Sequence, residues 1–276
     1  MTLAEWLRKT VGKLHAACLS SPCLFWVTMA LGFLVLDLVL AHCAVLGCDA
    51  KPSGTTTVLV ASDPHFSEVC PFAGTWMRHL MDAAVSRWQP DAVVVTGDIL
   101  SNVGGRNSAF NVSNWWYDAL ALQVKRSMQC DRTTCHFVPG NHDLELNKYH
   151  HRYVKHFGWP HCHRRAGNAD LYLFNSMDPN GTLAEPKGPG PVDFLFAHHP
   201  AQSRYIEFQP SASFLNTIRP QWIITGHDHK FNPEHSVELR GWQMKGVTVP
   251  SLSFYRSRRD GGRTGVVLLH LSLIHI

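Results

Sequence analysis

Five short apolar runs, each followed at once by polar residues of the metal-binding type, constrain this chain more than any other feature. The runs are rich in Val, Ile, Leu and Phe, and they occupy residues 57–61, 92–96, 136–138, 193–197 and 222–225. Runs of this length and composition are typical of strands buried on both faces of a sheet. The sequence therefore predicts a sheet whose strands end in histidine, aspartate or asparagine.

Helical patterns lie between several of these runs. Apolar residues recur every fourth position from Phe72 to Trp88 and again from Trp116 to Val124. This spacing places them on one face of a helix. Buried strands that alternate with helices indicate an α/β domain whose sheets are covered on both faces.

The C-terminal part of the chain shows no helical spacing. Residues 243–255 and 264–270 both have the composition of strands, and the turn Asp260-Gly261-Gly262 lies between them. A turn of this composition favours a hairpin. We therefore expect the two strands to pair with each other and to close the domain.

Each of the five apolar runs leads into side chains that can bind a metal ion. In chain order these residues are Asp63 and His65, Asp98, then Asn141, His142 and Asp143, then His198 and His199, and finally His227, Asp228 and His229. In open α/β sheets the ligand site lies outside the carboxyl ends of the strands. We therefore expect five loops that are far apart in sequence to converge on one site.

The chemistry of the set points to a pair of metal ions. It contains imidazoles, carboxylates and one amide but no thiolate, which suits Mn, Fe or Zn rather than a sulfur-bound structural zinc. Six or seven such ligands are too many for one tetrahedral ion and fit two ions that share a carboxylate. Such a pair, about 3.5–4 Å apart, can bind a phosphate and hold a hydroxide for in-line attack. A glycine directly before Asp98, Asn141 and His227 allows close backbone approach.

In order and spacing these residues resemble the signature of the calcineurin-like metallophosphoesterases, over about residues 57–229. The matching segments are Asp63-Pro-His65, Gly97-Asp98, Gly140-Asn-His-Asp143, His198 and Gly226-His-Asp-His229. The resemblance implies an α/β fold, a β-sandwich flanked by helices. It also implies two divalent metal ions as cofactors, with manganese favoured over iron or zinc.

The resemblance further implies a role for each residue of the site. The implied metal ligands are Asp63, His65 and His229 for the first ion, Asn141, His198 and His227 for the second, and Asp98 as the bridge. His142 would face the phosphate, as a transition-state donor or as the acid to the leaving oxygen. Asp143 would orient that histidine, and Asp228 would point away from the ions.

A narrower resemblance comes from the residues around the motifs. Trp88-Gln-Pro-Asp91, Val138–Asp143 and Val247–Phe254 with the arginines after it are similar to the GPI-anchor-remodelling branch of the family. This branch is the group of post-GPI attachment to proteins factor five and its fungal relatives. Its members are membrane-anchored lumenal enzymes that use manganese to remove ethanolamine phosphate from the GPI glycan. The implied partner is thus a GPI-linked glycolipid or glycoprotein in the endoplasmic reticulum or Golgi.

Other functions remain open at this level. Asp98 is followed by Ile99 and Leu100, whereas protein Ser/Thr phosphatases carry Arg-Gly there, so a protein phosphatase is disfavoured. A phosphodiesterase or phosphatase for nucleotides or sphingolipid head groups is the main alternative. A metal-free scaffold of the same fold would be expected to have lost ligands. The net charge of +4 over 276 residues is spread along the chain and gives no indication of nucleic-acid binding.

Residues 24–46 form an almost wholly apolar stretch of 23 residues near the N-terminus. As a helix it would cross a hydrocarbon core of about 30 Å. Because Arg8, Lys9 and Lys13 precede it, we expect residues 1–23 in the cytosol. After a linker at residues 47–56, residues 57–276 would then form a lumenal domain. A cleavable signal peptide is the alternative, although its apolar region usually runs only about 7–15 residues.

Three smaller features bear on a lumenal domain. Asn111 and Asn180 each stand in a glycosylation acceptor triplet. Cys48 lies at the edge of the apolar stretch, and four further cysteines follow it, at positions 70, 130, 135 and 162. These four allow three pairings, of which Cys130–Cys135 closes the shortest loop, and buried free thiols are the alternative. Arg256 and Arg258 could bind a second phosphate or a glycan-linked anion, or could simply lie on a solvated turn.

Overall fold

The computed structural model describes residues 55–66, 71–101, 114–144, 150–178, 190–200, 210–239, 241–253 and 265–271. All of them belong to the unit Cys48–Ile276. The expected cytoplasmic tail and membrane anchor lie outside the described residues, as do Asn111, Asn180, Arg256 and Arg258. Within the described ranges no helix combines the length and the apolar character needed to cross a membrane.

The first sheet has four strands in the order β10-β1-β2-β3. Its strands and the two helices between them are β1 (Thr56–Ala61), α3 (Pro71–Trp88), β2 (Ala92–Thr96), α4 (Asn114–Ser127), β3 (Thr134–Val138) and β10 (Val267–Leu271). β1, β2 and β3 run parallel, and β10 runs antiparallel to β1. Every residue of β1 and β2 is buried, as the continuous apolar runs predict.

The second sheet has six strands in the order β4-β5-β6-β7-β9-β8. Their bounds are β4 (Cys162–Ala166), β5 (Ala169–Phe174), β6 (Phe194–Ala197), β7 (Trp222–Thr225), β8 (Asn232–Leu239) and β9 (Trp242–Thr248). β5, β6, β7 and β9 run parallel, while β4 and β8 are antiparallel strands at the two edges. The four inner strands point their carboxyl ends toward the same edge of the sheet.

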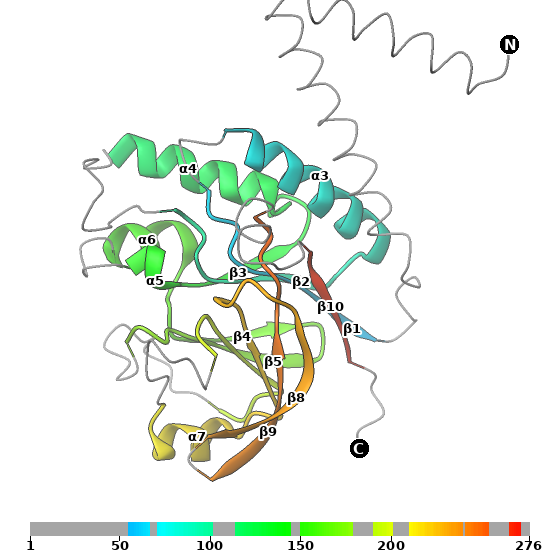
Figure 1. Cartoon of the computed structure of the whole chain (residues 1–276), viewed down its shortest axis with the longest axis vertical. Helices are drawn as coiled ribbons and strands as arrows, with labels where there is room; N and C mark the ends of the chain where they lie inside the picture. The colour runs from blue at the N-terminus through cyan, green and yellow to red at the C-terminus, as the bar shows by residue number, and fades with distance from the viewer. Residues whose placement is uncertain are drawn as a thin grey trace, which may run out of the picture. The chain divides into compact units, whose positions relative to one another are not determined.

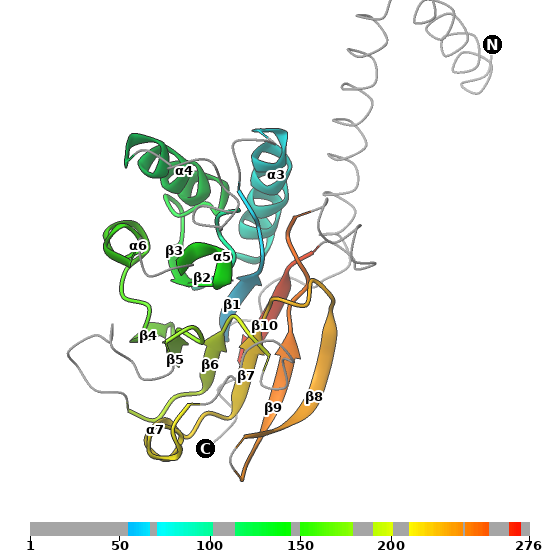
Figure 2. The same ribbon diagram turned by 60° about the vertical axis from the view of Figure 1, so that its left-hand side comes forward.

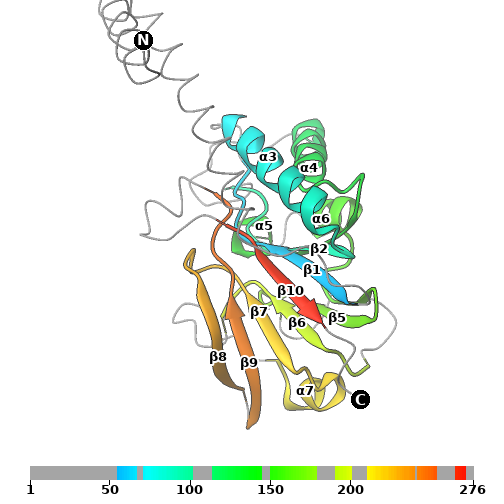
Figure 3. The same cartoon turned by 90° about the vertical axis from the view of Figure 1, so that its right-hand side faces the viewer.

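The two sheets pack face to face around one hydrophobic core. Val58 and Val94 of the first sheet belong to the same buried cluster as Leu171, Phe196 and Ile224 of the second. α3 and α4 lie over the outer face of the first sheet, and α7 (Ala212–Ile218) lies against the second (Figures 1 and 3). The expectation of a β-sandwich flanked by helices is therefore confirmed. The short helices α5 (Asn141–Leu144) and α6 (His150–Phe157) follow β3.

The expected C-terminal hairpin is wrong. β9 pairs with β7 and β8 in the second sheet, whereas β10 pairs with β1 in the first (Figure 2). β1 is an edge strand without β10, and an unpaired edge leaves main-chain N–H and C=O groups without partners. The last strand therefore covers that edge instead of folding back on its neighbour in sequence.

A disulfide joins Cys130, which follows α4, to Cys135 at the start of β3, with a Cα–Cα distance of 5.4 Å. Of the pairings left open by the sequence, this is the one that closes the shortest loop. The bridge ties the end of α4 to the start of β3. It therefore restrains the strand that carries Asn141 and His142 at its other end.

Candidate metal centre

The loops that follow β1, β2, β3, β6 and β7 meet at one place between the two sheets. Main-chain hydrogen bonds tie them together: the His65 N–H donates to the carbonyl of Asp98 at 2.9 Å, and the Gly226 N–H donates to that of His198 at 2.9 Å. Three of these loops come from the first sheet and two from the second. The convergence expected from the five strand ends is therefore found.

One group of ligand-type atoms comes from Asp63, His65, Asp98 and His229. These atoms lie within 4.8 Å of one another, and all four residues are buried. His65 Nε2 is 3.2 Å from His229 Nε2, and Asp63 Oδ1 is 3.3 Å from His229 Nε2. Asp63 Oδ1 is buried without a well-formed hydrogen bond. A buried carboxylate oxygen of this kind beside two facing imidazoles fits a divalent cation.

A second group surrounds His198. Its Nε2 lies 3.1 Å from Asn141 Oδ1 and 3.2 Å from His227 Nδ1. Its Nδ1 lies 2.8 Å from the carbonyl oxygen of Thr96, which can only accept a hydrogen bond. The Nδ1–H therefore donates to Thr96, and Nε2 is turned toward Asn141 and His227. This is the arrangement expected of a histidine that binds a metal ion.

Asp98 belongs to the first group and also faces the second. Its Oδ2 is 3.6 Å from His65 Nε2 in the first group, and its Oδ1 is 3.4 Å from His198 Nε2 in the second. Oδ1 also accepts the main-chain N–H of His142 at 2.9 Å. A carboxylate that offers one oxygen to each group has the placement that a bridging ligand requires.

Five of the expected ligands have a left-handed backbone conformation. Their φ angles are 50° for Asp63, 47° for His65, 47° for Asp98, 68° for His227 and 56° for His229. This conformation costs a non-glycine residue on the order of 1 kcal/mol. Strain of this kind is typical of sites whose surroundings force the geometry. The strand ends are thus bent so that neighbouring side chains can point into one centre.

The glycines expected to allow close approach do so. A Cβ added at Gly97, Gly140 or Gly226 would lie 2.3 Å or less from an atom of the site. At Gly226 that atom is Ser62 Oγ, only 1.8 Å away. No side chain fits there without moving the loop that carries Asp63.

His142 lies at the edge of the centre that is open to solvent. Its side chain is 23% exposed, and its Nε2 is 3.8 Å from Asp98 Oδ2. Its ring centroid is 5.2 Å from that of His65. A substrate arriving from solvent would therefore meet His142 beside the buried candidate ligands, and the expected role of His142 in the reaction stays a prediction.

Asp143 differs from the expectation that it orients His142. Its carboxylate accepts main-chain N–H groups from Gly140 at 2.8 Å, Ile99 at 3.1 Å and Leu100 at 2.9 Å. These donors lie in the turns after β2 and β3, which are buried and need an acceptor. Asp143 therefore joins the two loops that carry Asp98 and Asn141. Burial and the nearby charge of Asp98 raise the pKa of Asp143 to about 7, although the three N–H donors act in the opposite direction.

The electrostatics of the centre favour bound cations. Burial opposes the charge on Asp63 and Asp98, but the surrounding histidines outweigh it and lower the pKa of both carboxyls. Burial alone would lower the pKa of His198, yet the charge of Asp98 raises it to about 10. The carboxylates are therefore charged and hold a proton on His198 in the absence of a metal ion. Because His198 Nε2 must lose this proton to become a ligand, ion binding competes with protons.

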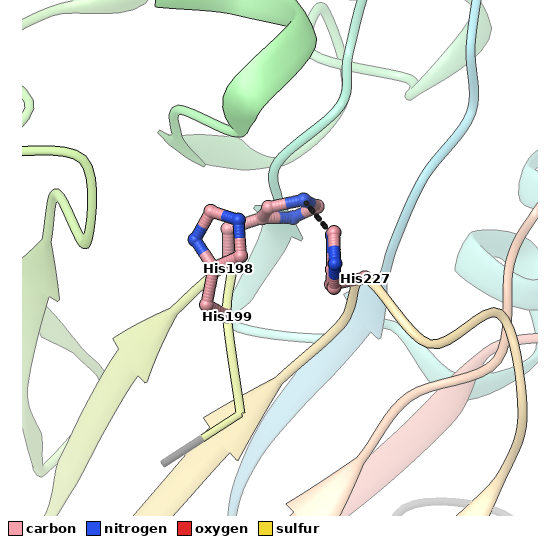
Figure 4. A group of neighbouring side chains, drawn as sticks. All are labelled: His198, His199 and His227. Atoms are coloured by element: carbon pink, nitrogen blue, oxygen red, sulfur yellow. Dashed lines mark hydrogen bonds between the residues drawn. The ribbon is translucent and has the colours of Figure 1, made fainter. Parts of the chain in front are cut away.

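Asp228 and His199, which neighbour the candidate ligands, differ in their exposure to solvent. Asp228 is exposed and its N–H donates to the carbonyl of Gly226, in agreement with the expectation that it points away. His199, which follows the fourth apolar run but is not in the ligand set implied by the family resemblance, is fully buried beside His198 and His227 (Figure 4). Its burial and the charges of those two histidines lower the pKa of His199 to about 2. Its only signal in the sequence is the histidine doublet after the fourth run.

Residues 56–231 match the family described as calcineurin-like phosphoesterase. A dimetal phosphatase from Danio rerio is similar in structure, with a TM-score of 0.55 and 13% identity over 79% of this chain and 93% of that chain. A purple acid phosphatase from yellow lupin (Lupinus luteus) seeds has a TM-score of 0.46 and 9% identity, over 71% of this chain and 44% of that chain. No curated protein matches the sequence.

The family match spans more than half of the chain and contains every expected ligand from Asp63 to His229. The structural likeness to the Danio rerio protein supports the same fold. The two groups of candidate ligands lie at the strand ends, where a phosphoester hydrolase of this fold would hold its metal ions. This chain belongs to the calcineurin-like phosphoesterase family.

Proposed function

We propose that this protein hydrolyses a phosphodiester with two bound divalent metal ions. The observation that carries the proposal is the position of Asp98, whose two carboxylate oxygens face His198 and His65 in different ligand groups. Shared carboxylates are the hallmark of two-ion centres that act on phosphate esters. Manganese suits the mixed oxygen and imidazole donors, and iron or zinc would also fit them.

Each residue of the site has a distinct part in this reaction. Bound ions supply positive charge for the phosphate oxygens and lower the pKa of an attacking water. Asp98 holds the two ligand groups together, while Asp143 fixes the turn on which Asp98 stands. His142, at the exposed edge, donates a hydrogen bond to the phosphate or a proton to the leaving oxygen.

The substrate that we propose is the ethanolamine phosphate side branch of GPI-anchor glycans. Support comes from the similarity of residues 88–91, 138–143 and 247–254 to the GPI-remodelling branch. The apolar stretch 24–46 would anchor the enzyme in the membrane of the endoplasmic reticulum or Golgi with its catalytic domain in the lumen. The disulfide Cys130–Cys135 suits such an oxidising compartment. The ligands themselves recognise only phosphate, so the surrounding loops must select the alcohol.

The chemical part of the proposal is tested with bis(p-nitrophenyl) phosphate and the full chain. Hydrolysis should require Mn²⁺ or a similar ion and should stop on chelation. Asp98→Ala and His227→Ala should abolish turnover while circular dichroism and thermal unfolding show a preserved fold. Turnover by either variant, or by the chelated protein, would refute the two-ion assignment.

The substrate is tested separately, in cells that lack the protein. We expect their GPI glycans to retain ethanolamine phosphate, and re-expression of the parent chain to remove it. The Asp98→Ala chain serves as the matched control and should not restore removal. Unchanged ethanolamine phosphate content in the deficient cells would contradict the GPI substrate but not the proposed two-ion hydrolysis. Assays with nucleotide diesters and sphingolipid head groups would then identify the substrate class.

A further inference from the structure

Three histidines form a packed group at the second half of the metal centre. The ring centroids are 4.7 Å apart for His198 and His199, 4.5 Å for His199 and His227, and 5.0 Å for His198 and His227. Figure 4 shows the three rings gathered around one region, with the hydrogen-bond contact between His198 and His227. One ring nitrogen from each lies within 4.8 Å of the others. This spacing is compatible with a common metal ion.

Ser176 fixes the orientation of His199. Its Oγ lies 2.7 Å from His199 Nδ1, and the same oxygen accepts the main-chain N–H of His199 at 3.3 Å. Ser176 follows β5, which runs parallel to β6, the strand that leads into His199. The buried hydroxyl of Ser176 therefore holds both the backbone and the ring of His199. The Nδ1 atom is thereby occupied, and Nε2 is the nitrogen left for another partner.

His199 Nε2 is buried and makes no hydrogen bond. Burying an unpaired polar atom costs free energy, and such atoms are rare unless a ligand or ion completes them. Asp63 Oδ1, an expected ligand of the first ion, is in the same condition. His198 repeats the pattern of His199, with its Nδ1 against Thr96 and its Nε2 turned into the centre. His199 and the candidate ligand His198 therefore have the same arrangement, in which an oxygen atom holds Nδ1 and Nε2 is available to an ion.

We propose that His199 Nε2 is an additional ligand of the second metal ion, oriented by Ser176. The inference rests on the two-ion function proposed above. It changes the set of ligands of the second ion, which we call the second half-site; the ligands of the first ion form the first half-site. That half-site would have three imidazoles, from His198, His199 and His227, with oxygens from Asp98 and Asn141. The first half-site has two imidazoles and two carboxylates. Since nitrogen donors favour Zn, Fe or Co over Mn, the second half-site should be the more selective for those ions.

Metal binding, rather than activity, tests the assignment. The full chain is stripped of metal and titrated with Co²⁺ and with Mn²⁺, by calorimetry and by the visible absorption of Co²⁺. The variants are His199→Ala, His199→Gln and Ser176→Ala. His163→Ala is the matched control, because His163 lies on β4 and contacts Asp170 rather than the centre. Circular dichroism and thermal unfolding confirm that each variant is folded, and His199→Gln replaces His199→Ala if the latter is not.

The parent and His163→Ala should bind two ions. In the His199 variants the first ion should bind unchanged and the second at least about tenfold more weakly, with the Co²⁺ preference reduced. Ser176→Ala should weaken the second ion by about 10- to 100-fold, as loss of a ligand-orienting partner does. A crystal structure with Zn²⁺ should place His199 Nε2 about 2.1 Å from the second ion.

Two results would overturn the assignment of His199. One is a second ion that binds the His199 variants with the parent affinity. The other is a Zn²⁺ structure with Nε2 more than about 3 Å from the ion, well outside a coordination bond. A parent chain that binds fewer than two ions would instead contradict the proposed function. The two failures are therefore distinguishable.

Discussion

The Nε2 atoms of His65 and His229 face each other at 3.2 Å, although 164 residues separate them in the chain. Left-handed backbone at both residues, with φ of 47° and 56°, bends the loops after β1 and β7 to bring the rings together. Two imidazole nitrogens that face each other in this way suit a cation held between them. The buried carboxylates of Asp63 and Asp98 beside them supply the balancing charge.

Metal ions should stabilise the folded protein as well as support its activity. At an ion concentration about 100 times the dissociation constant, binding to the folded state alone adds about 2.7 kcal/mol to the free energy of unfolding. We expect Mn²⁺ to raise the unfolding temperature and chelation to lower it. The Asp98→Ala chain should show a smaller shift. Identical unfolding temperatures with Mn²⁺ and with chelator would mean that the folded protein does not bind the ion.

Replacing His142 should separate the reaction from ion binding. His142 lies outside both ligand groups, with its ring partly exposed and its Nε2 3.8 Å from Asp98 Oδ2. We expect His142→Ala to lower kcat by about 10²- to 10⁴-fold, which is the usual contribution of a proton donor. The number of bound ions, measured by calorimetry, should stay at two. An unchanged kcat would remove His142 from the reaction, and a lost ion would make it a ligand instead.

Gly226→Ala should damage the first half-site through a steric clash. The added Cβ would lie 1.8 Å from Ser62 Oγ and 2.7 Å from Asp63 Oδ2. Because Asp63 is an expected ligand, we expect the first ion to bind at least about tenfold more weakly. Gly190→Ala is the matched control, since a Cβ there meets nothing within 4 Å. Equal ion affinities in the two variants would show that the close approach at Gly226 does not position Asp63.

His136 should make the protein sensitive to acid. Burial, with a smaller effect of Arg164, lowers the pKa of His136 from 6.5 to about 4. Above pH 6.5 the ring is neutral in both states, so its contribution to stability is fully present there. As the pH falls from 6.5 to 4 the unfolded chain takes up the proton first, and on the order of 3 kcal/mol of stability is lost.

The variant His136→Phe should flatten this part of the stability profile. Urea unfolding at several pH values between 4 and 7 measures the effect as a change in the midpoint. His151→Phe is the control, because His151 is exposed on α6. If the urea midpoint fell equally steeply with pH in the parent and in His136→Phe, the acid sensitivity would not originate in His136.

Much of the site could be predicted because each ligand directly follows a buried strand. Continuous apolar runs identify β2 and β7 with the bounds that the structure shows, and the polar residues after them are the candidate ligands. His199 was harder to assign. Successive residues of a strand point to opposite sides, so a doublet predicts one inward histidine. β6 ends at Ala197, before the doublet, and the alternation no longer applies.

The edges of the second sheet could not be predicted from apolar runs. β4 contains charged residues in its centre, and most of β8 is exposed, so neither shows a continuous apolar pattern. An edge strand has a neighbouring strand on one side only, so fewer of its residues must be apolar. Polar residues there also discourage pairing with other chains. The partner of β10 was missed for a related reason. Its sequence indicates a strand but carries no information on which free edge it will cover.

The central claim is that two metal ions share Asp98. Anomalous diffraction from crystals of the Mn²⁺-loaded protein measures this directly. We expect two peaks about 3.5–4 Å apart, with the carboxylate of Asp98 bound to both ions. A single peak, or two peaks without Asp98 between them, would contradict this claim.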